Sequence, residues 1–155
     1  MPTHPNYTMT RVRDPIHDYI DLTSLETKLV DTPSYQRIRW IRQLGPTNLV
    51  YPGANHTRHE HCMGTCHVVG RMADSGGLDS EERQLVSAAG LLHDLGHSPF
   101  SHLGDEIDGL ENHVDRTTSL VSKTEISDIL SEEGIDSNEI NQIITGNHNL
   151  GSLVS

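Results

Sequence analysis

Apolar residues recur every three or four positions through most of the chain, as they do on one face of an α-helix. From Leu85 to Leu92 the apolar residues leave almost no polar face, which is typical of a central, buried helix; they are Leu85, Val86, Ala88, Ala89, Leu91 and Leu92. Ser, Thr or Asp precedes several of these segments and glycine follows them, as at helix ends. The pattern predicts helices over about 58–73, from 79 or 80 to 96, and over 101–110, 111–121, 124–133 and 137–145.

The first 30 residues have an extended pattern instead. Val12 to Leu22 predicts two short strands around a turn at Pro15 to Asp18, so a small hairpin is expected. Asp31-Thr-Pro33 then predicts a helix start, because a capping side chain precedes proline in the first turn. That helix is expected to run to Leu44 and to end at Gly45-Pro46. The fold class is therefore mostly α, a helical core with a small N-terminal β-hairpin.

Length and composition predict one domain over residues 1–155. A chain of 155 residues builds about one core, and its 34% hydrophobic content lies above that of a disordered chain. No run approaches 18 apolar residues, which excludes a membrane span, and no secretory signal is visible at the start. We therefore expect a cytoplasmic protein without a membrane partner.

The charge is strongly negative. Twenty-two Asp and Glu against eleven Lys and Arg give a formal net charge of −11, and only two of the basic residues are lysines. Tight binding to duplex DNA is not expected, because it depends on a basic surface. An acidic, lysine-poor chain is also typical of proteins kept soluble in concentrated salt, so adaptation to salt is a hypothesis.

Eleven histidines are present, and most of them fall between His56 and His113. If Gly76-Gly77 folds two helices into an antiparallel hairpin, each arm from the turn to the histidines is about 21–24 Å long. This places His61 beside His93 and Asp94 and predicts a divalent-metal site with room for water or substrate. The alternative is that His93 interacts with the dipole of its helix C-terminus while Asp94 is solvated.

Four segments resemble one known family. Leu91-Leu-His-Asp-Leu-Gly-His-Ser-Pro-Phe-Ser-His102 is similar to the signature of HD-domain metal-dependent phosphohydrolases, in particular the deoxynucleoside triphosphate triphosphohydrolase branch. Asp14 to His17, Asp31 to Gly45 and Tyr51 to Gly64 resemble the preceding segments of that branch. The resemblance implies an HD-domain helical core.

The resemblance also implies a set of site residues. His61, His93 and Asp94 would bind one divalent ion, which is Mn, Fe, Mg, Zn or Ni. The implied catalytic residues are His113, His97 and Asp105. The implied substrate-binding residues are Arg58, Gln43, Leu44 and His102.

The implied reaction is attack of water on the α-phosphate of a dNTP, which releases a deoxynucleoside and triphosphate. A nucleotide, most specifically a dNTP, is thus the expected partner, and members of the family often form homo-oligomers. Asp31, Gln36 and Arg39 match a nucleotide-effector site of regulated members.

The chain also departs from this family. His59 replaces a usual phenylalanine, and the family's fourth metal ligand, an aspartate, lies in a helix beyond Ser155. The chain is therefore expected to be the N-terminal part of a larger family domain. Two alternatives remain: a truncated, non-catalytic HD-domain fragment, and an HD phosphodiesterase or nucleotidase. Cys62 and Cys66 are one helical turn apart, which predicts reduced, packed thiols rather than a haem or zinc site.

Overall fold

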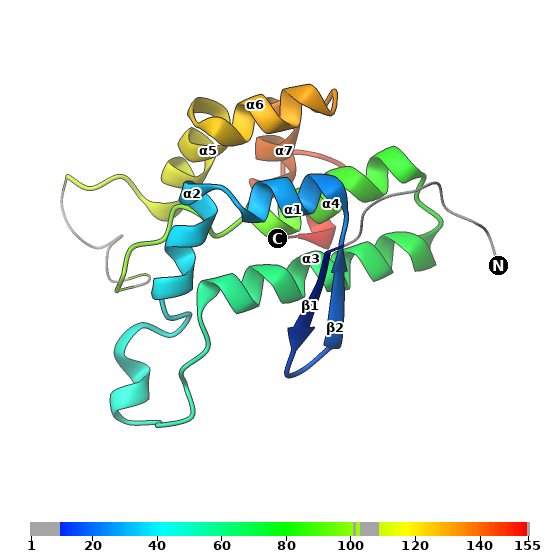
Figure 1. Cartoon of the computed structure of the whole chain (residues 1–155). Helices are drawn as coiled ribbons and strands as arrows, with labels where there is room; N and C mark the ends of the chain where they lie inside the picture. The colour runs from blue at the N-terminus through cyan, green and yellow to red at the C-terminus, as the bar shows by residue number, and fades with distance from the viewer. Residues whose placement is uncertain (1–9, 101, 103–108, 155) are drawn as a thin grey trace.

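A computed structural model describes residues 10–100, 102 and 109–154, and it confirms a mostly helical chain with an N-terminal hairpin (Figure 1). The described residues also contain 3₁₀ turns at Arg37–Trp40, Gly45–Leu49 and Gly151–Leu153. The strands and α-helices are β1 (Thr10–Asp14), β2 (Asp18–Leu22), α1 (Ser24–Val30), α2 (Pro33–Gln36), α3 (Arg58–Gly76), α4 (Ser80–Leu92), α5 (His113–Lys123), α6 (Glu125–Glu132) and α7 (Ser137–Ile144).

The predicted N-terminal hairpin is confirmed. β1 and β2 pair antiparallel with Val12 opposite Ile20, and Asp18 closes the turn with φ 62°. Ile20 and Leu22 are buried, so one face of the ribbon belongs to the core while the other faces solvent. The hairpin therefore packs against α3 and α1 instead of standing alone.

The centre of the molecule is the predicted antiparallel pair, α3 and α4. Gly77 ends α3 in the left-handed conformation, φ 73°, which glycine adopts without a steric cost. Asp79 and Glu82 begin α4 with a reciprocal capping box. Every residue from Val86 to Leu92 is buried, which confirms α4 as the central helix. Because both ends of the connection are fixed, α4 runs back along α3, and its C-terminal end lies beside His61 near the start of α3.

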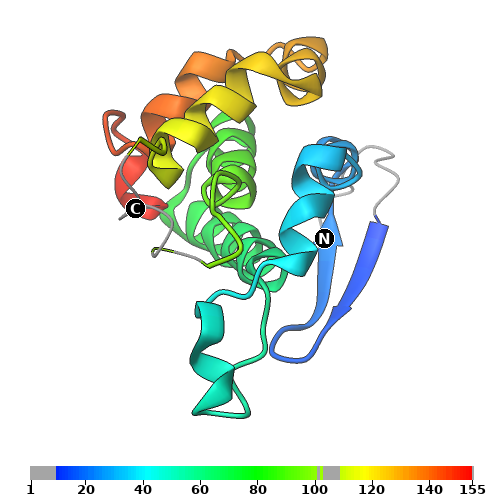
Figure 2. The ribbon, with the colours of Figure 1, turned by 90° about the vertical axis from the view of Figure 1, so that its left-hand side faces the viewer.

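Two groups of elements cover this pair. Figure 2 shows α3 and α4 nearly end-on, with α5, α6 and α7 on one side and α1, α2 and the hairpin on the other. Among the described residues, no helix is both long and apolar enough to cross a bilayer. Cys62 and Cys66 are unpaired and buried in α3, as predicted, and burial raises the pKa of both thiols.

Two expectations for the N-terminal region are wrong. The segment predicted as extended contains α1, which begins with a capping box between Thr23 and Glu26 and buries Leu25 and Leu29. The helix predicted to reach Leu44 ends at Trp40 instead. Residue 41 becomes extended, and its carbonyl accepts a hydrogen bond from the Arg58 amide at the start of α3 (2.8 Å). Pairing with the segment that enters α3 thus competes successfully with helix continuation.

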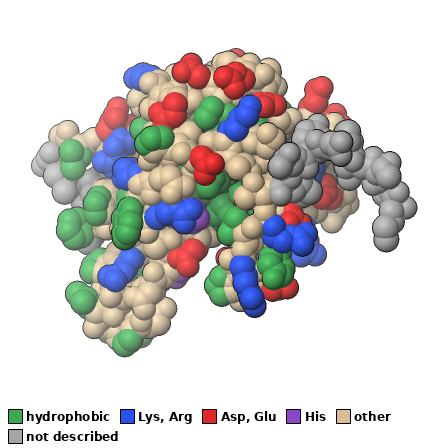
Figure 3. Space-filling model, in the orientation of Figure 1, with side chains coloured by type: hydrophobic (Ala, Val, Ile, Leu, Met, Phe, Trp, Pro, Cys, Tyr) green, Lys and Arg blue, Asp and Glu red, His purple; other side chains and the backbone are tan. Residues whose placement is uncertain are grey.

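The early end of that helix leaves apolar side chains on the surface. Trp40 is 87% exposed, and Leu49, Val50 and Tyr51 are also exposed. Figure 3 shows hydrophobic side chains gathered around this lower-left part of the molecule, with basic ones beside them. Acidic side chains lie mainly over the top, where α5 to α7 lie. The helix predicted over 101–110 lies mostly outside the described residues, and the remaining helices begin and end within a few residues of their predicted limits.

His59 is a buried polar residue in the core. Its ring meets Tyr35 edge to face with centroids 5.4 Å apart, and its Nε2 has no hydrogen-bond partner in the described structure. Burial, with a smaller contribution from Arg39, lowers the pKa of His59 to about 4. The imidazole is therefore neutral in the folded chain near neutral pH, but it gains a proton on unfolding below about pH 6.5.

We expect His59→Phe to raise the free energy of unfolding by on the order of 1–2 kcal/mol at pH 7.5, because an unsatisfied buried nitrogen is removed. The advantage should grow at pH 5. There the unfolded wild-type chain binds a proton that the folded chain does not, so wild-type stability falls as the pH drops from 6.5 toward 4. Urea unfolding at both pH values measures this, with the exposed His56→Gln as control. An equal gain at the two pH values would contradict the pH argument.

Candidate metal centre

His61 from α3 and His93 and Asp94 from the end of α4 lie together, as the antiparallel arrangement predicts. The Nε2 atoms of His61 and His93 are 3.1 Å apart, and Asp94 Oδ2 is 3.5 Å from His61 Nε2. His93 Nε2 is 3.6 Å from Asp94 Oδ1. One ligand atom from each residue thus lies within 4.8 Å of the others. Two imidazoles and a carboxylate are a donor set suited to a divalent transition metal.

The orientation of His93 supports a role as ligand. Its Nδ1 lies 2.8 Å from the carbonyl oxygen of Gly90, to which it donates a hydrogen bond, so the lone pair is on Nε2. That lone pair faces the Nε2 of His61 at a distance close to the spacing of two ligand atoms around one ion. The described residues therefore fit a bound divalent ion.

Asp94 contacts each of the other charged or ionisable groups around it, as its neighbours Arg58 and His97 show. Its carboxylate forms an ion pair with Arg58 and lies 3.4 Å from His97 Nε2. Burial opposes ionisation of Asp94, but the hydrogen bond from His97 and the electrostatic interactions with His93 and Arg58 outweigh it. The pKa of Asp94 consequently lies well below its usual range, and the carboxylate stays charged and available to a cation.

Arg58, predicted to hold a substrate phosphate, is 1% exposed. One guanidinium nitrogen contacts Asp94, and another lies 3.4 Å from the backbone carbonyl of Gln43. In this structure Arg58 orients Asp94 and links it to the segment before α3. Its contact with phosphate stays a prediction.

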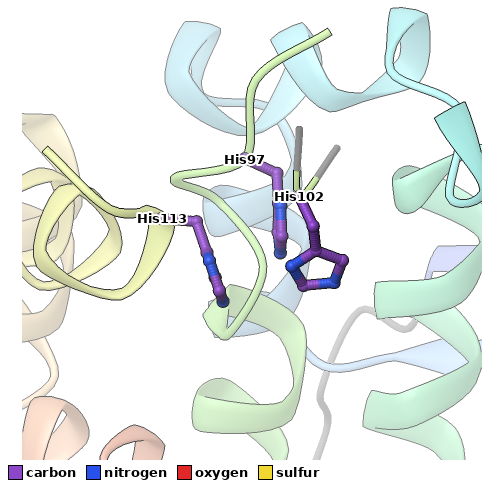
Figure 4. A group of neighbouring side chains, drawn as sticks. All are labelled: His97, His102 and His113. Carbon is purple, nitrogen blue, oxygen red and sulfur yellow. The ribbon is translucent and has the colours of Figure 1, made fainter. Parts of the chain in front are cut away.

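A second group of histidines lies beside the first. The rings of His97 and His113 are stacked with centroids 4.0 Å apart and an interplanar angle of 18°. The ring of His102 stands edge-on to both, at 4.8 Å from His97 and 5.1 Å from His113 (Figure 4). The structure thus brings three of the predicted catalytic and substrate-binding residues together, and Asp105 lies outside the described residues.

Gly96 and Thr117 hold α5, which carries His113, against the segment that follows α4. The Gly96 amide donates to Thr117 Oγ1 (2.8 Å), and that hydroxyl donates to the carbonyl of His113 (2.8 Å). Arg116 Nε donates to the Gly96 carbonyl (2.7 Å), and Arg37 donates to the carbonyls of Leu95 and His97. We call Gly96, Thr117 and Arg116 the α5 clasp, which fixes His113 beside His97.

Sequence reasoning did not identify the α5 clasp or Arg37. Thr117 is fully buried, yet it lies in a polar stretch of α5 with no pattern that marks it. The one available signal was Gly96 itself, because a glycine between two site residues indicates a close backbone approach.

The remaining predicted residues lie in the part of the chain that precedes α3. Leu44 is 48% exposed on the connection before α3. Of the predicted effector residues, Arg39 Nε donates to Gln36 Oε1 (2.5 Å) while Asp31 is exposed. A cavity of about 530 Å³ opens beside His61, between α3 and the hairpin turn. The site therefore has adjoining space of the size in which small molecules bind.

Together, the paired helices and the group of His61, His93 and Asp94 define a helical domain with residues that could hold a metal ion. Comparison with known proteins gives the particular family: the chain belongs to the HD-domain family, whose model matches residues 58–153. This result supports the resemblance drawn from the sequence motifs.

The similar proteins are much longer than this chain. It is 44% identical to human deoxynucleoside triphosphate triphosphohydrolase SAMHD1 over 105 residues, which are 63% of this chain and 17% of that protein. It is 40% identical to the uncharacterized protein YwfO of Bacillus subtilis over 76% of this chain and 29% of that protein. A crystal structure of a hypothetical protein from Aquifex aeolicus is similar with a TM-score of 0.76 and 35% identity, covering 89% of this chain and 38% of that one. The chain thus spans less than two fifths of each of these relatives.

Proposed function

We propose that the chain carries the catalytic metal centre of a nucleotide phosphohydrolase that cleaves a dNTP into deoxynucleoside and triphosphate. The observation that carries this proposal is the convergence of His61, His93 and Asp94 next to the stacked pair of His97 and His113. Similarity to SAMHD1 supports the choice of a dNTP as substrate.

The residues of the site have different proposed roles, which follow from their positions. When bound, a divalent ion at His61, His93 and Asp94 supplies positive charge for the phosphoryl oxygens and acidifies water. Arg58 keeps the Asp94 carboxylate ionised and oriented. Phosphate cleavage concentrates negative charge on oxygen, so fixed donors beside the reacting phosphorus lower its barrier.

His113 is the proposed proton-transfer residue. It is the first residue of α5, it is partly exposed, and the α5 clasp holds its backbone. An imidazole beside the reacting phosphate is a suitable group for general acid–base catalysis. His97 stacks on it and links it to Asp94, while His102 closes the group from the exposed side. His102 and Gln43 with Leu44 would contact the phosphate and the sugar, respectively.

An HD phosphodiesterase or nucleotidase uses the same kind of site, so product identity distinguishes these activities. The chain is incubated with each dNTP and Mn²⁺ at low and at molar salt, and the products are resolved by ³¹P NMR. We expect triphosphate, with no signal after treatment with a chelator. Pyrophosphate or inorganic phosphate would support the alternative reactions. Turnover that survives chelation would contradict the metal-dependent mechanism.

Absence of turnover together with absence of bound ion would support a non-catalytic fragment. The salt series also tests adaptation to concentrated salt, which predicts that activity persists in molar salt. Homo-oligomer formation and effector binding at Asp31, Gln36 and Arg39 stay proposals drawn from the family resemblance.

A further inference from the structure

His97 and His102 lie in the connection between α4 and α5, and His113 is the first residue of α5, yet their three rings lie together (Figure 4). One ring nitrogen from each lies within 4.8 Å of the other two. His97 is 1% exposed, His113 is partly exposed and His102 is exposed, so the group runs from the interior to solvent. A cation in solution can therefore reach this group without the core opening.

We infer that these three histidines form a second metal site, distinct from His61, His93 and Asp94, which binds Zn²⁺ and chemically similar ions. The donor set consists of three imidazoles. Such a set favours Zn²⁺, Co²⁺, Ni²⁺ or Cu²⁺ over Mg²⁺ and Ca²⁺, which prefer oxygen ligands. Three protein ligands leave a fourth position open to water, as in other zinc sites with His ligands.

The environment of His97 provides an independent observation. Its Nε2 donates to Asp94 Oδ1 (3.4 Å), which leaves the lone pair on Nδ1. That Nδ1 is buried and has no hydrogen-bond partner among the described residues. A buried polar atom without a partner is costly, so a cation that reached this lone pair would be favoured there. Asp94 also places a negative charge next to the group.

The stacked rings show what must change for an ion to bind. Parallel rings direct their lone pairs side by side, so one ring must rotate before His97 and His113 can share an ion. His113 is the ring able to do so, because it is partly exposed at the first turn of α5 while His97 is enclosed. Ion binding is thus expected to separate the stacked pair.

Occupation of this second site would inhibit the enzyme, an inference that rests on the proposed function. An ion there would take up the ring lone pairs that proton transfer and phosphate binding require. Excess Zn²⁺ is therefore expected to stop turnover that Mn²⁺ supports, and a zinc-selective chelator is expected to restore it.

Co²⁺ titration of the metal-free chain tests the site without any activity assay, because Co²⁺ replaces Zn²⁺ and absorbs visible light when bound in a tetrahedral site. We expect about two equivalents to bind the wild-type chain and about one to bind either His102→Ala or His61→Ala. His148→Ala, outside both groups, should keep both. His102 is exposed, so its replacement should leave the fold intact, which circular dichroism verifies.

Binding of a single equivalent to the wild-type chain, or of two to His102→Ala, would overturn this inference. The number of Co²⁺ equivalents bound can be interpreted independently of whether the chain hydrolyses dNTPs. An inactive chain that binds two equivalents in this pattern upholds the second site and counts against the hydrolase. An active chain that binds only one upholds the hydrolase and eliminates the second site.

Discussion

Asp94→Asn is expected to abolish divalent-ion binding at His61 and His93 and, with it, all metal-dependent hydrolysis. The substitution keeps the shape of the side chain but removes the negative charge that attracts the cation. It also removes the charged partner of a buried ion pair, since Arg58 is 1% exposed and pairs with Asp94. We expect a loss of about 3–5 kcal/mol in the free energy of unfolding even without metal. Calorimetric metal titration and urea unfolding measure the two effects.

A double variant separates the two roles of Asp94. Arg58→Met combined with Asp94→Asn removes both charges of the buried ion pair, so much of the lost stability should return while metal binding stays absent. Full stability and normal metal affinity in the single variant would contradict both roles. Equal instability of the single and double variants would show that the ion pair is not the source of the loss.

The pH dependence of stability provides a further check on the same residue. Because the pKa of Asp94 lies below its value in the unfolded chain, near 3.9, its contribution is fully present above about pH 4. It is lost as the pH falls toward the pKa of the folded state. Asp94→Asn lacks this contribution at every pH, so the difference between wild type and variant should shrink in acid.

The grouping of His61, His93 and Asp94 could be predicted because it depends on local rules. Gly76-Gly77 indicates a reversal of the chain, and the fixed rise of an α-helix converts sequence distance into length. His61, His93 and Asp94 therefore had to lie at similar depth once α3 and α4 were antiparallel. The same argument required no knowledge of the remaining elements.

The errors in the N-terminal region have different origins. The start of α1 is marked in the sequence by Thr23 followed three residues later by Glu26, a capping-box pattern that the extended interpretation overlooked. The premature end of the next helix has no such local mark. Ile41 leaves the helix because its carbonyl pairs with the Arg58 amide, and that partner is 17 residues away. Hydrophobic periodicity carries no information about such a contact.

The surroundings of the histidines were the least predictable part. Arg37, Arg116 and Thr117 bind the backbone of the segment after α4, and two of them lie some 20 residues beyond it. Backbone carbonyls have no residue identity, so nothing in the sequence pairs them with particular side chains. These contacts hold α5 against the segment after α4 and thereby position His113. Substitutions in the α5 clasp therefore test whether the position of His113 matters for hydrolysis.

Gly96→Ala is expected to lower hydrolysis by about 100-fold or more while the metal ligands keep their ion. A Cβ at this position would lie 2.1 Å from the His113 carbonyl oxygen, 2.5 Å from the Thr117 amide nitrogen and 2.7 Å from Thr117 Oγ1. Two of these atoms are backbone, so α5 must move away from the segment after α4. A displacement of about 1 Å at a proton-transfer group is enough for an effect of this size. The free energy of unfolding should fall by about 3 kcal/mol.

Gly53→Ala is the matched control, because a Cβ there meets nothing within 4 Å, and it should change neither activity nor stability. Thr117→Val tests the same contact without a clash, since it keeps the shape of the side chain but removes the hydroxyl that bonds to the Gly96 amide and the His113 carbonyl. We expect it to lower activity less than Gly96→Ala and to leave metal affinity unchanged. If Gly96→Ala unfolds the chain, Thr117→Val still decides the question. Wild-type hydrolysis by Thr117→Val, at reduced stability, would show that the clasp holds the fold together but does not position His113.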